Sequence, residues 1–176
     1  MRQLIRFLPQ DINENNIVKA QILLGDNYET FELYTGDWSK EDFVNQWKSA
    51  VRLSLKKRET TALFKNYKHD SISGIKILWL YTIIPEELAY PDKFIHADGV
   101  DFYITESFRF FTEKLEILAD DASYNLINKN YGHYFPIYWL NIHKLERFYL
   151  YLSDRVEGIS HWKVNKQDLK SILNYL

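Results

Sequence analysis

The strongest constraint on the fold is an amphipathic stretch between residues 39 and 57. Ser39 is a favourable N-cap, and Asp42 three residues later completes a capping box in which Asp replaces Glu. Basic residues at 56–58 complement the negative C-terminal end of a helix. Apolar residues recur at intervals of three and four, the spacing of one helix face: Phe43, Trp47, Ala50, Val51 and Leu55. We therefore expect a helix over 39–57 that packs this face against a sheet.

Several other segments carry the signals of β-strands. Residues 17–24 and 28–35 flank Gly25-Asp26-Asn27, a three-residue connection typical of a β-hairpin. In the second of these segments, Phe31 and Leu33 alternate with polar residues, which indicates a half-buried strand. A nearly continuous run of β-branched and aromatic residues at 75–84 favours a strand that is buried on both faces. Further strands are expected at 2–8, 60–67, 100–108 and 159–164.

The segment 108–153 gives ambiguous signals. Residues 108–119 fit either a continuing strand or a short helix, and 123–130 fit a short helix or a loop. Between 143 and 153 an alternating pattern competes with helical spacing, and we expect a helix there. The helical spacing comes from Leu145, Phe148, Tyr149 and Leu152, and the alternation from Phe148, Leu150 and Leu152.

The C-terminal segment predicts a last helix. Asn165 is a suitable N-cap, and Leu169, Ile172 and Leu173 form an apolar stripe behind it. Together the segments predict a single domain over 1–176 of the α+β class. Its expected architecture is a mainly antiparallel sheet that carries the amphipathic helix (about 39–57) and a C-terminal helix.

Composition excludes several classes of protein. There is no cysteine, which excludes disulfides, a thiolate nucleophile, iron–sulfur clusters and the common cysteine zinc sites. The longest apolar-rich run, 75–85, is far below the ~20 residues that a bilayer span needs. The apolar start at 1–9 is too short for a signal-peptide core. We expect a soluble cytoplasmic protein with no membrane partner.

No pattern of catalytic or metal-ligating residues is evident. The five histidines form no HExxH motif or other close ligand pair, and there is no glycine-rich phosphate loop or G-x-S-x-G elbow. His96 and Asp98 are the least unfavourable pair for a base or a metal, and a polar loop is the competing interpretation. We expect no catalysis, no metal and no cofactor. A small cytosolic enzyme of unknown reaction is the alternative.

Charge is distributed unevenly along the chain. The segment 40–76 carries a net charge of +5, which permits a nucleic-acid-binding module, although a solvated helix face is the favoured interpretation. The segment 86–121 carries −7, so the rest of this −2 chain carries +5. An acidic segment of this kind permits electrostatic steering of a basic partner.

Five short motifs follow one another in order over most of the chain. They are Gly36-Asp37-Trp38-Ser39-Lys40-Glu41-Asp42-Phe43 with Gln46-Trp47, Thr61-Ala62-Leu63, Trp79-Leu80-Tyr81, the run 100–110 with Tyr103-Ile104 and Glu106, and Ile159-Ser160-His161-Trp162-Lys163-Val164. This order resembles the immunity proteins of contact-dependent growth inhibition systems. That family usually has an acidic residue where His161 stands, and fewer residues between the strand at 100–110 and the final strand.

The resemblance implies a non-enzymatic, cytosolic immunity protein that binds the toxic C-terminal domain of a delivered effector. The matched motifs correspond to scaffold, so they do not identify toxin contacts. Nuclease domains need positive charge to hold phosphates, so we expect a nuclease toxin that is occluded stoichiometrically by the acidic segment. The candidate toxin-binding residues are Glu86, Glu87, Tyr90, Asp92, Asp98 and Asp101, with the aromatic stretch 131–138 as the next candidate.

Overall fold

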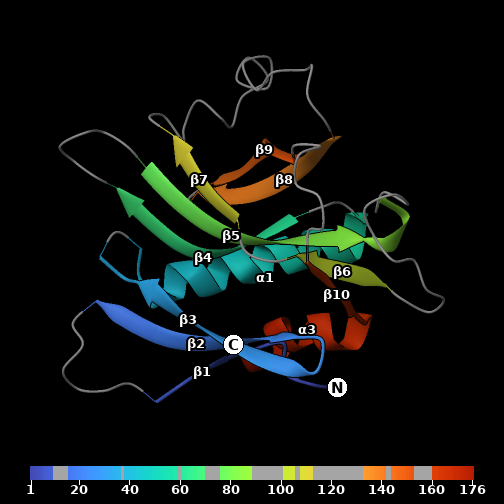
Figure 1. The fold of residues 1–176 in the computed structure, drawn as a ribbon, viewed down its shortest axis with the longest axis horizontal. Helices are drawn as coiled ribbons and strands as arrows, with labels where there is room; N and C mark the ends of the chain where they lie inside the picture. The colour runs from blue at the N-terminus through green and yellow to red at the C-terminus, as the bar shows by residue number, and fades with distance from the viewer. Residues whose placement is uncertain are drawn as a thin grey trace.

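The computed structural model describes ten ranges of the chain. They are 1–9, 16–36, 38–58, 61–69, 76–88, 101–105, 108–112, 133–141, 144–152 and 160–176. Within them the fold is α+β, with antiparallel strand pairing throughout, as the sequence predicts (Figure 1). The predictions for 123–130 lie outside the described residues.

The first sheet has the order β1-β2-β3 and is formed by β1 (Ile5–Phe7), β2 (Ile17–Leu24) and β3 (Asn27–Tyr34). Leu24 pairs with Asn27, so the hairpin loop is two residues long, one fewer than predicted. Gly25 in this loop has φ +64°, as type II′ turns require at their first central position. Phe31 and Leu33 are buried while their neighbours Thr30 and Glu32 are exposed, which confirms the predicted alternation.

The second sheet has the order β10-β6-β5-β4, and β7 also pairs with β5. β6 and β7 pair with successive halves of β5. β6 lies within the strand predicted at 100–108, and β7 shows that 108–112 is a strand and not a helix. Residues 80–84 of β5 are all buried, which confirms the predicted burial on both faces over this half of the strand. The strands are β4 (Thr61–His69), β5 (Lys76–Pro85), β6 (Phe102–Thr105), β7 (Phe108–Thr112) and β10 (His161–Val164).

In the described ranges two α-helices cover these sheets, and both N-caps are the predicted ones. Helix α1 (Lys40–Lys57) begins with a capping box, since Ser39 Oγ accepts from Asp42 N–H and Asp42 Oδ2 accepts from Ser39 N–H. Helix α3 (Lys166–Tyr175) begins after Asn165, whose side chain accepts from Asp168 N–H at 2.7 Å. In Figure 1, α1 crosses the molecule where the two sheets approach each other.

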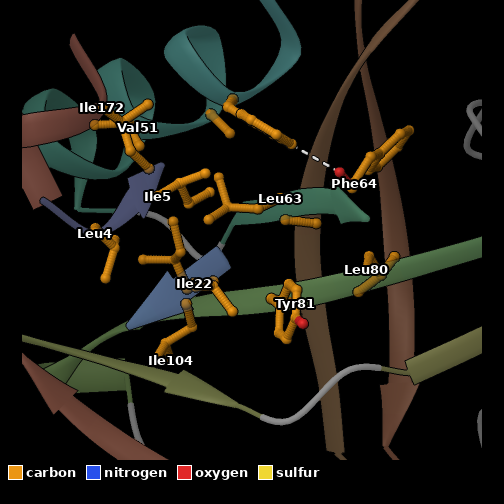
Figure 2. Close-up of a cluster of buried hydrophobic side chains, with 14 of the residues drawn as sticks. Leu4, Ile5, Ile22, Val51, Leu63, Phe64, Leu80, Tyr81, Ile104 and Ile172 are labelled. Carbon is orange, nitrogen blue, oxygen red and sulfur yellow. Dashed lines mark hydrogen bonds between the residues drawn. The ribbon is translucent and has the colours of Figure 1, made fainter. Parts of the chain in front are cut away.

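The outward edge of β4 is satisfied by side chains of α1. The Gln46 amide donates to the Ala62 carbonyl at 2.7 Å and accepts from Phe64 N–H at 3.0 Å. The indole N–H of Trp47 donates to the Phe64 carbonyl at 2.7 Å, as the dashed line in Figure 2 shows. Strand edges present unpaired backbone groups to other chains. The helix therefore closes part of this edge as well as covering the core.

Buried side chains from both sheets and both helices form the core (Figure 2). Trp47 is fully buried and contacts the rings of Phe7 and Phe31, which belong to the first sheet. Tyr81 of β5 donates its hydroxyl to Glu29 of β3 at 2.7 Å, and burial raises the pKa of this phenol far above its ordinary value. The core thus joins the two sheets through apolar and polar contacts.

A separate hairpin joins β8 (His133–Asn141) and β9 (Lys144–Leu152). The helix predicted at 143–153 is therefore wrong. Residues 144–152 pair in register with 133–141, so tertiary pairing decides between the two competing periodicities. The aromatic stretch 131–138 falls largely on β8, and residues 131 and 132 lie outside the described ranges.

Candidate functional site

Three of the six predicted toxin-binding residues lie in the described ranges, and the fold brings them together. Glu86 and Glu87 begin the short 3-10 turn η1 (Glu86–Leu88) after β5, and Asp101 directly precedes β6. Since β5 and β6 are neighbours, Glu86 N–H donates to the Asp101 carbonyl at 3.2 Å. Tyr90, Asp92 and Asp98 lie outside the described residues, and so does the catalytic alternative His96.

Arg58, at the C-terminal end of α1, contacts both Glu87 and Asp101. Its guanidinium donates to both carboxylate oxygens of Glu87, at 2.7 and 2.6 Å, and to the Asp101 carbonyl at 2.9 Å. It also lies over the ring of Phe102, with Cζ 4.3 Å from the ring centroid. The hydrogen bonds from Arg58 lower the pKa of Glu87 below its ordinary value, and the same contact raises the pKa of Arg58.

Arg58 holds Glu87 and Asp101 next to the C-terminal end of α1, and we call these three residues the base of the acidic segment. The side chains of Arg58 and Glu87 are 37% and 46% exposed, so their ion pair contributes only about 0–1 kcal/mol. The Asp101 carboxylate accepts from Lys166 N–H at 2.7 Å, at the start of α3. Glu87 and Asp101 are therefore engaged within the chain, and whether they also contact a toxin stays a prediction.

Sequence reasoning missed the role of Arg58, which it assigned to the helix dipole. Arg58 is the C-cap and has φ 53° and ψ 46°, the left-handed conformation that helices usually place on glycine. The available signal was the absence of glycine or asparagine directly after the apolar stripe. A non-glycine residue is uncommon in this conformation, and here the side chain of Arg58 is held by Glu87 and by the Asp101 carbonyl.

The structure divides the predicted basic segment 40–76 into engaged and unengaged cations. Arg58 pairs with Glu87. Lys65 Nζ lies 3.5 Å from Glu29 Oε1, and Lys40 Nζ lies 3.9 Å from the ring centroid of Phe7. A second group forms a ridge along α1 at intervals of four residues, and we call it the α1 ridge: Lys48, Arg52 and Lys56. Within the described residues, none of these three forms an ion pair.

The α1 ridge has few acidic neighbours. Arg52 and Lys56 are exposed and Lys48 is half-buried. No acidic residue occurs from 43 to 58, and the acid of the adjacent helix α3, Asp168, is buried and paired with Arg2. A recess of about 390 Å³ lies at the Lys48 end of the ridge. It is lined by Lys40, Glu41, Val44, Asn45, Lys48 and Leu176.

Two structural features are absent from the described part of the chain. Its His, Asp and Glu side chains form no group of three or more that could hold a metal ion. None of the helices found there combines the length and the apolar character that crossing a lipid bilayer demands.

Comparisons with known proteins give a likeness of fold. Neither a family model nor a curated protein matches the sequence. Among solved structures, the chain is similar to one from the CdiA-CT/CdiI toxin and immunity complex from Enterobacter cloacae, with a TM-score of 0.54 and 12% identity. The match covers 97% of this chain and 94% of that chain. The fold of this chain is thus shared with a component of a contact-dependent growth inhibition complex.

Proposed function

We propose that this chain is a cytosolic immunity protein that binds and neutralises the toxin domain of a contact-dependent growth inhibition effector. The observation that carries the proposal is the likeness of fold, over 97% of the chain, to a component of a toxin and immunity complex. The five ordered sequence motifs resemble immunity proteins, and they favour the immunity component over the toxin component. The action we propose is stoichiometric occlusion, with no reaction catalysed by this chain.

The proposed toxin is a nuclease, and the proposed contact is the acidic segment. A nuclease presents cations to bind phosphates, and carboxylates on an inhibitor complement that surface. The base of the acidic segment supports this role, because Arg58 ties Glu87 and Asp101 to α1 and the central strands. A base of this kind lowers the entropy that binding would cost.

A growth assay tests the proposal. Under this proposal an effector is encoded beside this chain, and its C-terminal domain is induced in bacteria with and without this protein. We expect arrest by the domain alone and restored growth when the protein is co-expressed. A Trp47→Asp variant, which places a charge in the core, is the non-folding control. Continued arrest despite the folded protein would contradict the proposal, and so would arrest caused by this chain alone.

A charge-reversal experiment tests the acidic contact. Glu87 is left intact because it holds Arg58, and the variant reverses Glu86, Asp92 and Asp98 to lysine. We expect slower association with the inactivated toxin domain and a flatter salt dependence, with unchanged folding. The matched control reverses three acids outside both the acidic segment and α1, Glu14, Asp26 and Glu32. Equal rates for both variants at low salt would place the contact elsewhere, with β8 as the next candidate.

A further inference from the structure

We infer that the α1 ridge is a second contact surface, and that it takes an acidic surface segment of the same toxin domain. This inference rests on the proposed function. The ridge runs along α1 and ends two residues before Arg58, which holds Glu87 and the base of the acidic segment. The row of cations therefore ends at the same end of α1 as the carboxylate that Arg58 holds. A partner that contacts both surfaces must present acidic groups to the ridge and basic groups to the carboxylates, and this fixes its orientation.

The ridge is not explained by the stability of the helix. Like charges four residues apart on a helix destabilise it, and the ridge contains two such pairs, Lys48 with Arg52 and Arg52 with Lys56. The helix dipole favours cations only within the last turn, which includes Lys56 but not Lys48 or Arg52. The charges of Lys48 and Arg52 therefore weaken α1 slightly, and no described residue forms an ion pair with either of them to compensate. A contact with an external anionic group would offset this repulsion.

An acidic protein segment fits the ridge better than a nucleic acid does. A phosphate backbone that followed the ridge would meet Glu41 at one end and Glu86 and Glu87 at the other. The recess of about 390 Å³ beside Lys48 also has two apolar lining residues, Val44 and Leu176. A protein side chain can place an apolar body there with a carboxylate near Lys40 or Lys48, as anchoring residues do in protein interfaces.

The test compares association rates for two charge-reversed variants. Lys48→Glu with Arg52→Glu keeps one like-charge pair at the same spacing and turns residues 52 and 56 into an opposite-charge pair, so we do not expect the variant to weaken α1. The matched control is Arg6→Glu with Lys163→Glu, which changes the net charge equally at exposed positions off the ridge. The probe is the inactivated C-terminal domain of the neighbouring effector. We expect the ridge variant to associate at least about tenfold more slowly than the control at low salt, with the difference shrinking as salt rises.

The outcomes separate this inference from the proposed function. If the wild-type protein does not bind the toxin domain, both fail. If it binds and the ridge variant associates at the rate of the control, only the inference fails. A Lys48→Gln, Arg52→Gln variant gives the same comparison if the reversed form does not fold. Fluorescence anisotropy with a labelled single-stranded RNA provides the remaining arm. RNA binding that is lost in the ridge variant, with toxin binding unchanged, would assign the ridge to nucleic acid and overturn the inference.

Discussion

Replacing Gln46 with methionine tests how α1 is fastened to the second sheet. Gln46 is 1% exposed, and its amide satisfies the Ala62 carbonyl and the Phe64 N–H. Methionine has a similar length, so the variant removes two hydrogen bonds without opening a large cavity. Each buried backbone group left without a partner costs about 1–3 kcal/mol. We therefore expect a loss of about 2–6 kcal/mol before the added apolar burial offsets part of it, against a typical total stability of about 5–15 kcal/mol.

Chemical denaturation followed by tryptophan fluorescence and far-UV circular dichroism measures this loss. The matched control is Asn45→Met, which makes a comparable amide-to-methionine change at an exposed position one residue earlier. The control should change the free energy of unfolding by no more than about 0.5 kcal/mol. If Gln46→Met lowered stability no more than Asn45→Met does, the proposed closure of the β4 edge by Gln46 would be refuted.

Three further predictions concern the core and the Arg58 cluster. Trp47→Ala removes a fully buried ring and should cost about 3–5 kcal/mol, and an unchanged denaturation midpoint would show that this ring is not core. Arg58→Gly should leave the free energy of unfolding within about 1 kcal/mol, since glycine suits the left-handed C-cap while a weak ion pair is lost; a loss above about 2 kcal/mol would contradict this. The lowered pKa of Glu87 predicts stabilisation that is complete above the ordinary carboxyl pKa and disappears as the pH falls through the lowered value. Denaturation midpoints between pH 3 and 6 should therefore fall less steeply in Arg58→Gly than in the wild type, and parallel curves would argue against the pair.

Local signals predicted much of the fold correctly. The capping box at Ser39 and Asp42 and the apolar stripe behind it are encoded within a few residues, and α1 starts and ends where they indicate. The hairpin of β2 and β3 was also predicted, except that Gly25 adopts a positive φ and shortens the loop to two residues. These features depend on neighbouring residues, so one sequence is enough to find them.

Long-range partners explain what the sequence could not predict. The spacing of Leu145, Phe148 and Leu152 fits a helix as well as a strand, and only the pairing with β8 decides the outcome. Arg58 contacts Glu87 and Asp101, which lie 29 and 43 positions further along the chain, so the local sequence of α1 cannot identify these partners. The sequence predicted the candidate site as an acidic segment. The contacts of Arg58 at its base, and the lack of ion-pair partners along the α1 ridge among the described residues, depend on how distant elements are placed in the fold.

The most direct test of immunity by binding is a titration of toxin activity. The C-terminal domain of the neighbouring effector is held at a fixed concentration above the dissociation constant, and its degradation of RNA or DNA is measured as this protein is added. We predict a linear fall in activity that reaches zero at one equivalent, because each bound protein occludes one active site. Undiminished activity at a large excess would contradict binding. Complete loss at a small fraction of an equivalent would contradict stoichiometric occlusion and indicate an enzyme instead.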